Sequence, residues 1–167
     1  YDPYVDAGYE KVLDATRHDS LKELLGTSDI ISVHVPLSSE TEGMINDDFI
    51  NSMKTGSILI NTARGGLLSS YDCLAKGILS GRIGAVGLDV LPEEPPEIDK
   101  QNIFLSSWID LNSEFSDRII INPHTAYYSP DSYEEMRYKA SKMSLNALDG
   151  IQKQNRIVWN FKKEKWK

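Results

Sequence analysis

Segment 57–68, which reads S-I-L-I-N-T-A-R-G-G-L-L, constrains the fold more than any other part of the chain. Its apolar run at 58–60 predicts a short, fully buried strand. The run ends at polar Asn61 and Thr62, and Arg64 follows before a new apolar pattern begins. Ligands bind at the carboxyl ends of strands in open α/β sheets, so such a strand would hold Arg64 at a binding crevice. An arginine that caps a surface turn explains these residues equally well.

Strand and helix patterns alternate on both sides of this segment. Strand patterns cover residues 30–35, 57–61, 83–90 and 118–122, and helical patterns cover residues 20–26, 46–53, 69–81 and 129–150. Ser20 and Glu23 have the spacing of a capping box, and Gly26 is expected to stop that helix. The alternation predicts an α/β fold with a doubly wound parallel sheet. Segment 93–117 breaks the pattern, and its apolar residues 103–109 predict a partly buried excursion.

Composition restricts the classes of function that are open to the chain. The 167 residues carry a formal net charge of −7, which opposes nucleic acid as the main partner because phosphate binding needs clustered positive charge. No apolar run approaches the roughly 20 residues that span a bilayer, so no membrane partner is predicted. Cys73, the single cysteine, excludes an internal disulfide framework and fits a reducing compartment, so we expect a cytoplasmic protein. Because the chain starts at Tyr1 without methionine, we expect a fragment of a longer protein.

Three polar features follow predicted strands, and parallel strands would bring them to one edge of the sheet. They are Arg64, the pair Glu93 and Glu94, and His124. Singly, each has an ordinary explanation as a surface arginine, a solvated acidic turn and a loop histidine. Together they suit hydride transfer on a hydroxy acid, because arginine binds a carboxylate and carbonyl and histidine carries a proton. A neighbouring carboxylate favours the protonated form of a histidine.

The first residues, Y-D-P-Y, are typical of the end of a strand followed by a turn, because Pro3 biases Asp2 away from helix. An acidic residue at the end of such a strand accepts hydrogen bonds from the adenosine ribose of NAD and disfavours the extra phosphate of NADP. Asp2 is equally explained as a residue that shapes the turn with Pro3. The glycine-rich loop that would decide between these explanations is not in this sequence.

Four motifs follow one another along the chain. They are H-V-P-L-S-S-E-T at 34–41, N-T-A-R-G-G at 61–66, G-L-D-V-L-P-E-E-P at 87–95 and N-P-H-T-A at 122–126. In type and order they resemble the D-isomer-specific 2-hydroxyacid dehydrogenases. Y-D-P-Y, H-T-A-Y-Y-S at 124–129 and E-E-M-R at 134–137 resemble, more narrowly, the C-terminal-binding-protein branch, which includes NAD-dependent corepressors and bacterial enzymes.

The resemblance implies an incomplete Rossmann-type sheet over residues 1–127, belonging to an NAD-binding domain. Residues 128–167 would form a connecting helix and a C-terminal segment of the substrate domain. The family's G-x-G-x-x-G loop and most of its N-terminal substrate domain would precede Tyr1. The fragment alone is therefore expected to be inactive.

The resemblance also implies roles for individual residues. Arg64 would bind the 2-oxo acid, His124 would be the acid/base, and Glu94 rather than Glu93 would be its acidic partner. Asp2 would hold the adenosine ribose of NAD. The other residues expected to contact the cofactor, besides Arg64 and His124, are Val35, Pro36, Thr41, Thr62, Ala63, Asp89 and Tyr127. Asp89 would meet the nicotinamide carboxamide, and Tyr127 stands where the corepressors carry a tryptophan.

We therefore predict that the full-length protein is an NAD-dependent D-2-hydroxyacid dehydrogenase. Its substrate would be a small 2-hydroxy or 2-oxo acid, and the family resemblance implies a homodimer. No metal site is predicted. The main rival is an NAD(H)-sensing, corepressor-like binding or scaffold protein with little or no turnover. A Rossmann-like module for another nucleotide would not explain why Arg64, Glu94 and His124 all occur.

Overall fold

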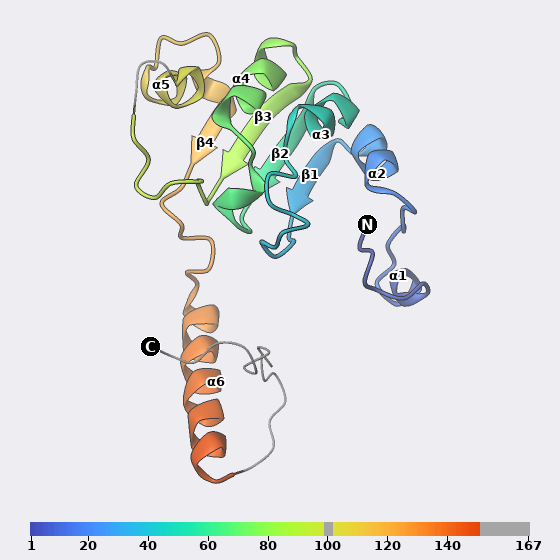
Figure 1. Ribbon diagram of the computed structural model, residues 1–167, viewed down its shortest axis with the longest axis vertical. Helices are drawn as coiled ribbons and strands as arrows, with labels where there is room; N and C mark the ends of the chain where they lie inside the picture. The colour runs from blue at the N-terminus through green and yellow to red at the C-terminus, as the bar shows by residue number, and fades with distance from the viewer. Residues whose placement is uncertain (99–101, 151–167) are drawn as a thin grey trace. The chain divides into compact units, whose positions relative to one another are not determined.

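The computed structural model describes residues 1–98 and 102–150 (Figure 1). Its elements in chain order are α1 (Tyr9–Val12), α2 (Leu21–Thr27), β1 (Ile30–Val33), α3 (Asp47–Ser52), β2 (Ser57–Asn61), η1 (Gly65–Leu67), α4 (Tyr71–Leu79), β3 (Ile83–Leu88), α5 (Ile103–Ile109), η2 (Ser116–Arg118), β4 (Ile119–Ile121) and α6 (Pro130–Leu148). The strands form one parallel sheet in the order β1-β2-β3-β4. The predicted α/β class with a parallel sheet is therefore confirmed. The first compact unit is Tyr1–Ala126, and a second begins at Tyr127.

One face of the sheet carries the core of the first unit. The register aligns four side chains, each at most 5% exposed, in a row across the strands: Ile31, Leu59, Val86 and Ile119. Helix α2 packs on α3, α3 on α4 and α4 on α5, which makes one helical layer along the sheet (Figure 1). On the opposite face, Ile30 is 59% exposed and Ile120 is 64% exposed. Within the described residues, the helices thus cover one face of the sheet.

Side-chain caps set the start of five helices. Ser20, Asn46, Ser70, Asn102 and Ser129 each accept a hydrogen bond from the backbone N–H three residues further on. Such a cap satisfies one of the donors that the first turn of a helix leaves unpaired. Because these bonds are local, the starts of α2, α3, α4 and α6 agree with the helical patterns in the sequence.

The predicted C-terminal ends of two strands are wrong, because strands β1 and β3 are each shorter than the apolar run that predicted them. β1 ends at Val33 and β3 at Leu88, each two residues before the end of its apolar run. Both strands pair with β2, whose last paired residue is Asn61. Beyond Asn61 β2 offers no further paired residue, so residues 34–35 and 89–90 lie outside the strands, although the N–H of Asp89 still donates to the carbonyl of Asn61.

Two further predictions are corrected near the start of the chain. Helix α2 continues through Gly26 and ends at Thr27, and the next residue, Ser28, adopts an extended backbone, so the predicted stop at Gly26 is wrong. Among the described residues, no strand includes Tyr1 or Asp2. The turn predicted there is present, and the side chain of Asp2 accepts a hydrogen bond from the N–H of Tyr4 at 2.9 Å.

The excursion between β3 and β4 contributes to the core, and its apolar residues form helix α5. Phe104 and Leu105 are at most 1% exposed, and the ring of Phe104 stacks on Tyr71 of α4 with centroids 5.9 Å apart. The partly buried excursion is therefore confirmed, although the sequence did not show that it is helical.

The second unit is described from Tyr127 to Gly150 and contains helix α6. None of the residues of α6 is buried. The remainder of the predicted substrate-domain segment, residues 151–167, lies outside the described residues. Of the helices in the described part of the chain, none has the length and apolar character that crossing a membrane requires.

Candidate active site

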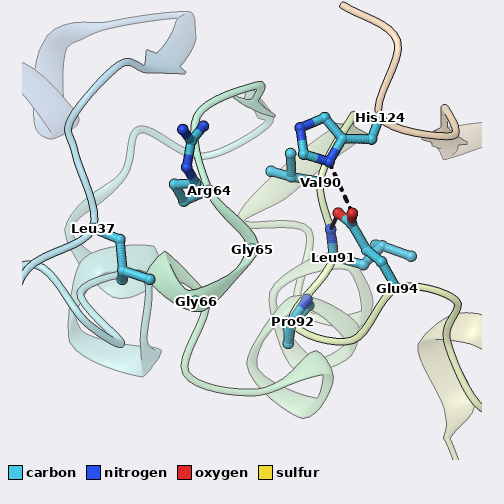
Figure 2. Close-up of a pocket in the computed structure, with 9 residues that line it drawn as sticks. All are labelled: Leu37, Arg64, Gly65, Gly66, Val90, Leu91, Pro92, Glu94 and His124. Carbon is cyan, nitrogen blue, oxygen red and sulfur yellow. Dashed lines mark hydrogen bonds and ion pairs between the residues drawn. The ribbon is translucent and has the colours of Figure 1, made fainter. Parts of the chain in front are cut away.

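The candidate site lies where the strands of the first unit end (Figure 2). A pocket of about 250 Å³ is lined by residues from the loops after all four strands: Leu37 after β1, Arg64, Gly65 and Gly66 after β2, Val90, Leu91, Pro92 and Glu94 after β3, and His124 after β4. The structure therefore brings Arg64, Glu94 and His124 to one pocket. Its other walls are apolar side chains and glycine backbone, which the sequence analysis did not single out.

The side chains of His124 and Glu94 form a hydrogen-bonded pair in this pocket. The Nδ1 atom of His124 lies 2.8 Å from Oε2 of Glu94, and Oε1 of Glu94 accepts a bond from the N–H of Leu91 at 2.9 Å. The bond from His124, followed by that from Leu91, holds the pKa of the Glu94 carboxyl below its usual value. A carboxylate only accepts hydrogen bonds, so Nδ1 carries the shared hydrogen. Figure 2 shows the second ring nitrogen on the side of the ring toward Arg64.

Arg64 is exposed at the carboxyl end of β2. Its Nη1 donates to the carbonyl oxygen of Ala63 at 2.6 Å. Because a guanidinium has five N–H donors, this bond leaves it able to bind a carboxylate. The turn beneath it is shaped by Asn61, which is 1% exposed. The amide of Asn61 donates to the carbonyl of Arg64 and accepts from the N–H of Ala63, both at 3.0 Å.

The position of Gly65, directly after Arg64, can only be occupied by glycine. A Cβ atom at this position would lie 1.9 Å from the carbonyl oxygen and 2.1 Å from the carbonyl carbon of Leu91. The loop after β2 therefore touches the backbone of the loop after β3, which carries Glu94. Only a residue without a side chain permits this approach.

Asp89 ties down the loop that carries His124. It is 4% exposed, its Oδ1 accepts from the N–H of Thr125 and its Oδ2 from the N–H of Ala126, both at 2.9 Å. His124 itself has φ 54°, in the left-handed region that non-glycine residues seldom adopt. Asp89 does not line the pocket of about 250 Å³. Its predicted contact with the nicotinamide carboxamide stays a prediction.

Five other predicted cofactor residues lie in the loops that follow β1 and β2. Val35, Pro36 and Thr41 lie in the loop after β1, where Thr41 Oγ1 donates to the carbonyl of Pro36 at 2.6 Å. Leu37 of the same loop reaches the pocket. Thr62 and Ala63 follow β2 in the turn that carries Arg64, and their predicted roles stay predictions.

Of the predicted cofactor residues, only Arg64 and His124 are in the lining of this pocket. Asp2 is exposed, and its carboxylate bonds the turn at Tyr4. Tyr127 is the first residue of the second unit and is 53% exposed. Their roles in cofactor binding stay predictions.

A second, mainly apolar pocket of about 450 Å³ also touches the hydrogen-bonded pair of His124 and Glu94. Glu94 and His124 line it together with residues from the excursion and the ends of β3 and β4: Leu91, Pro95, Pro96, Trp108, Ile121, Asn122 and Pro123. Trp108 comes from helix α5. The apolar run at 103–109 was the only signal in the sequence for this contribution. Across residues 1–98 and 102–150, no group of three or more His, Cys, Asp or Glu side chains could hold a metal ion.

Comparison with families of known proteins gives one match over most of the chain. Residues 1–126 match the D-isomer specific 2-hydroxyacid dehydrogenase, NAD binding domain family. A D-specific alpha-keto acid dehydrogenase of Enterococcus faecium is 36% identical over 148 residues, which cover 83% of this chain and 45% of the relative.

Solved structures show the same likeness. A D-lactate dehydrogenase of Aquifex aeolicus, crystallised with NAD and lactic acid, is 33% identical with a TM-score of 0.71, covering 88% of this chain and 45% of that one. The D-mandelate dehydrogenase of Rhodotorula graminis is 34% identical with a TM-score of 0.64, covering 80% of this chain and 35% of that one. The chain thus spans less than half the length of each of these similar proteins.

Proposed function

The chain belongs to the family of D-isomer-specific 2-hydroxyacid dehydrogenases, whose NAD-binding domain it matches over residues 1–126, and on this premise we propose an activity for the full-length protein. It transfers a hydride between NAD(H) and a D-2-hydroxy acid or the matching 2-oxo acid. The observation that carries the proposal is the 2.8 Å bond between His124 and Glu94 in a pocket that Arg64 also lines. The similar proteins act on alpha-keto acids, lactate and mandelate, which supports this substrate class.

In the proposed reaction, Arg64 binds the carboxylate and the carbonyl of the 2-oxo acid. A guanidinium presents a planar fork of donors that matches a carboxylate, and it stays charged at every physiological pH. The walls around Arg64 are apolar side chains and glycine backbone, so little else in the pocket competes for the acid. Its charge also stabilises negative charge that develops on the carbonyl oxygen during reduction.

His124 gives a proton to the carbonyl oxygen during reduction and takes it from the hydroxyl during oxidation. Its Nδ1 is bound to Glu94, so the proton exchanged with substrate is carried on Nε2. Glu94 keeps the ring in this orientation and stabilises the imidazolium form. Because two bonds hold the pKa of Glu94 below its usual value, its carboxylate stays charged throughout the cycle.

The residues present fit a nicotinamide ring. Leu37, Val90, Leu91 and Pro92 give the pocket apolar walls beside Arg64 and His124, and an uncharged ring packs well on such side chains. When bound, NAD(H) supplies or accepts the hydride at this ring. Binding its adenosine ribose is the role proposed for Asp2.

NADH oxidation by the full-length protein with a panel of 2-oxo acids tests the proposal. Removal of a general acid/base costs about 10²- to 10⁴-fold, so His124→Ala should lower kcat by that factor. Glu94→Gln should lower kcat as well, whereas Glu93→Gln, a substitution at the adjacent exposed residue, should leave it unchanged. Equal effects of the two glutamate substitutions would contradict the assigned roles.

The rival function is an NAD(H)-sensing, corepressor-like scaffold. Its support is the likeness of Y-D-P-Y, H-T-A-Y-Y-S and E-E-M-R to the C-terminal-binding-protein branch, and membership of that branch stays a prediction. Tight binding of NADH without turnover of any acid in the panel would favour the scaffold and reject the dehydrogenase.

Three further statements belong to the proposal. The full-length protein is a homodimer, as the family resemblance implies, and it is cytoplasmic, which the single cysteine supports. Residues 1–127 serve NAD binding, and residues 128–167 connect to the substrate domain. Sedimentation of the full-length protein, with a monomer as the contrary result, tests the first statement.

A further inference from the structure

Two buried polar side chains end the two central strands of the sheet. Asn61 is the last residue of β2 and is 1% exposed, and Asp89 directly follows β3 and is 4% exposed. The N–H of Asp89 donates to the carbonyl oxygen of Asn61 at 3.0 Å. The two residues are thus linked through the backbone at the carboxyl ends of the strands, where the candidate site lies. Polar groups are buried at low cost only when hydrogen-bonded, so their partners define their role.

The partners of Asp89 are the two residues that directly follow His124. Each carboxylate oxygen takes one backbone N–H, from Thr125 and from Ala126, at 2.9 Å. Bonds of this kind to a charged acceptor are about twice as strong as neutral ones. Thr125 and Ala126 are otherwise exposed, and His124 holds a left-handed backbone. The buried carboxylate therefore anchors an exposed loop at the position from which the imidazole projects.

The partners of Asn61 are in the turn that carries Arg64. Its amide nitrogen donates to the carbonyl of Arg64 and its oxygen accepts from the N–H of Ala63, both at 3.0 Å. This pair of bonds closes the turn on itself. Asn61 thus acts on the arginine as Asp89 acts on the histidine.

We propose that Asn61 and Asp89 are positioning residues, which together hold Arg64 and His124 at the spacing that turnover requires. The proposal rests on the proposed function. It gives Asp89 a role at the loop of His124 beside the contact with the nicotinamide carboxamide that the resemblance implies, because each of its oxygens accepts only one backbone N–H and can accept a further bond. Such positioning affects the rate because a displacement of about 1 Å in a reacting group costs about 100-fold.

Exchanges of carboxylate and amide test this proposal in the full-length protein without changing side-chain shape. Asp89→Asn leaves one acceptor oxygen for two N–H donors, so one of Thr125 and Ala126 would face an NH₂ group. We expect kcat to fall by about 10- to 100-fold, whatever the effect on the Kd for NADH. Asn61→Asp removes the donor to the carbonyl of Arg64 and should lower kcat/KM for the 2-oxo acid. Asp72→Asn, at an exposed residue of α4, is the matched control.

Hydrogen exchange gives a second readout that does not depend on turnover. The amides of Thr125 and Ala126 should exchange faster in Asp89→Asn than in the wild type, because one of their two acceptors is lost. Thermal unfolding tests whether each variant is folded. If Asp89→Asn does not fold, Asn61→Asp still tests the proposed role of Asn61.

The outcomes separate this proposal from the proposed function. A raised Kd for NADH with unchanged kcat in Asp89→Asn would assign Asp89 to the cofactor and overturn the positioning role. Unchanged kcat and unchanged exchange would overturn it as well. A wild-type protein that turns over no 2-oxo acid would reject the dehydrogenase, and hydrogen exchange alone would then decide whether Asp89 anchors the loop.

Discussion

Gly65→Ala is the substitution whose effect the structure defines most sharply. The added Cβ would lie 1.9 Å from the carbonyl oxygen of Leu91 and 2.6 Å from the nitrogen of Pro92. Heavy atoms in van der Waals contact are about 3.5 Å apart, so the two loops must separate by about 1.5 Å. Both obstacles are backbone atoms, which no change of rotamer can move aside.

The separation acts on function more than on stability. Overpacking of this kind costs about 1–3 kcal/mol, which lowers Tm by only a few degrees in a protein of this size. Arg64 adjoins Gly65, and Glu94 is in the same loop as Leu91, so the shift changes the spacing of these two proposed catalytic residues. A misplacement of about 1 Å costs about 100-fold, and we expect kcat/KM for the 2-oxo acid to fall by at least that factor.

Gly66→Ala provides the control for the full-length protein. Its Cβ would meet only the side chain of Leu37, at 2.9 Å, and the end of a flexible side chain can rotate away. NADH oxidation and thermal unfolding of both variants are the assays. Wild-type kcat/KM in Gly65→Ala, or equal losses in the two variants, would refute the inference that backbone contact between the loops sets the spacing of Arg64 and Glu94.

Three other substitutions have defined outcomes. Arg64→Lys keeps the charge but loses the planar fork, so KM for the 2-oxo acid should rise by about 10- to 100-fold, as the loss of about 1.5–3 kcal/mol implies. Tyr71→Phe should leave thermal stability unchanged or raise it, because no described residue bonds the buried hydroxyl. Burial, with the charges of Glu93 and Glu94, raises the pKa of Tyr71 to about 12, so the free energy of unfolding of the wild type should fall between pH 10.0 and about 12, and Tyr71→Phe should lack this part of the fall. Glu94→Gln removes a carboxylate whose pKa is lower in the fold than its usual 4.5, so its contribution to the free energy of unfolding is present above pH 4.5; urea unfolding of wild type and variant should differ at neutral pH and converge in acid.

Prediction from the sequence succeeded where the deciding contacts are local. Asn46 and Ser70 accept hydrogen bonds from N–H groups only three residues away, so the starts of α3 and α4 could be predicted from the sequence. Prediction failed at Gly26 and at the end of β3. A glycine accepts helical backbone as readily as it ends a helix, and β3 ends where its partner β2 ends. Because the end of β3 depends on its partner strand β2, the apolar run at 83–90 does not show where β3 ends.

The sequence alone determined the α/β class and the alternation of most strands and helices, and it predicted that Arg64, the pair Glu93 and Glu94, and His124 follow strands, because each depends on periodicity or on position after an apolar run. The choice of Glu94 over Glu93 came from the family resemblance. Only the tertiary structure decided how these residues are held. The contact of Gly65 with Leu91 and the bonds from Asp89 to the loop after β4 join segments far apart in the chain. Such contacts form only when the parallel strands align their carboxyl ends, so no local pattern encodes them.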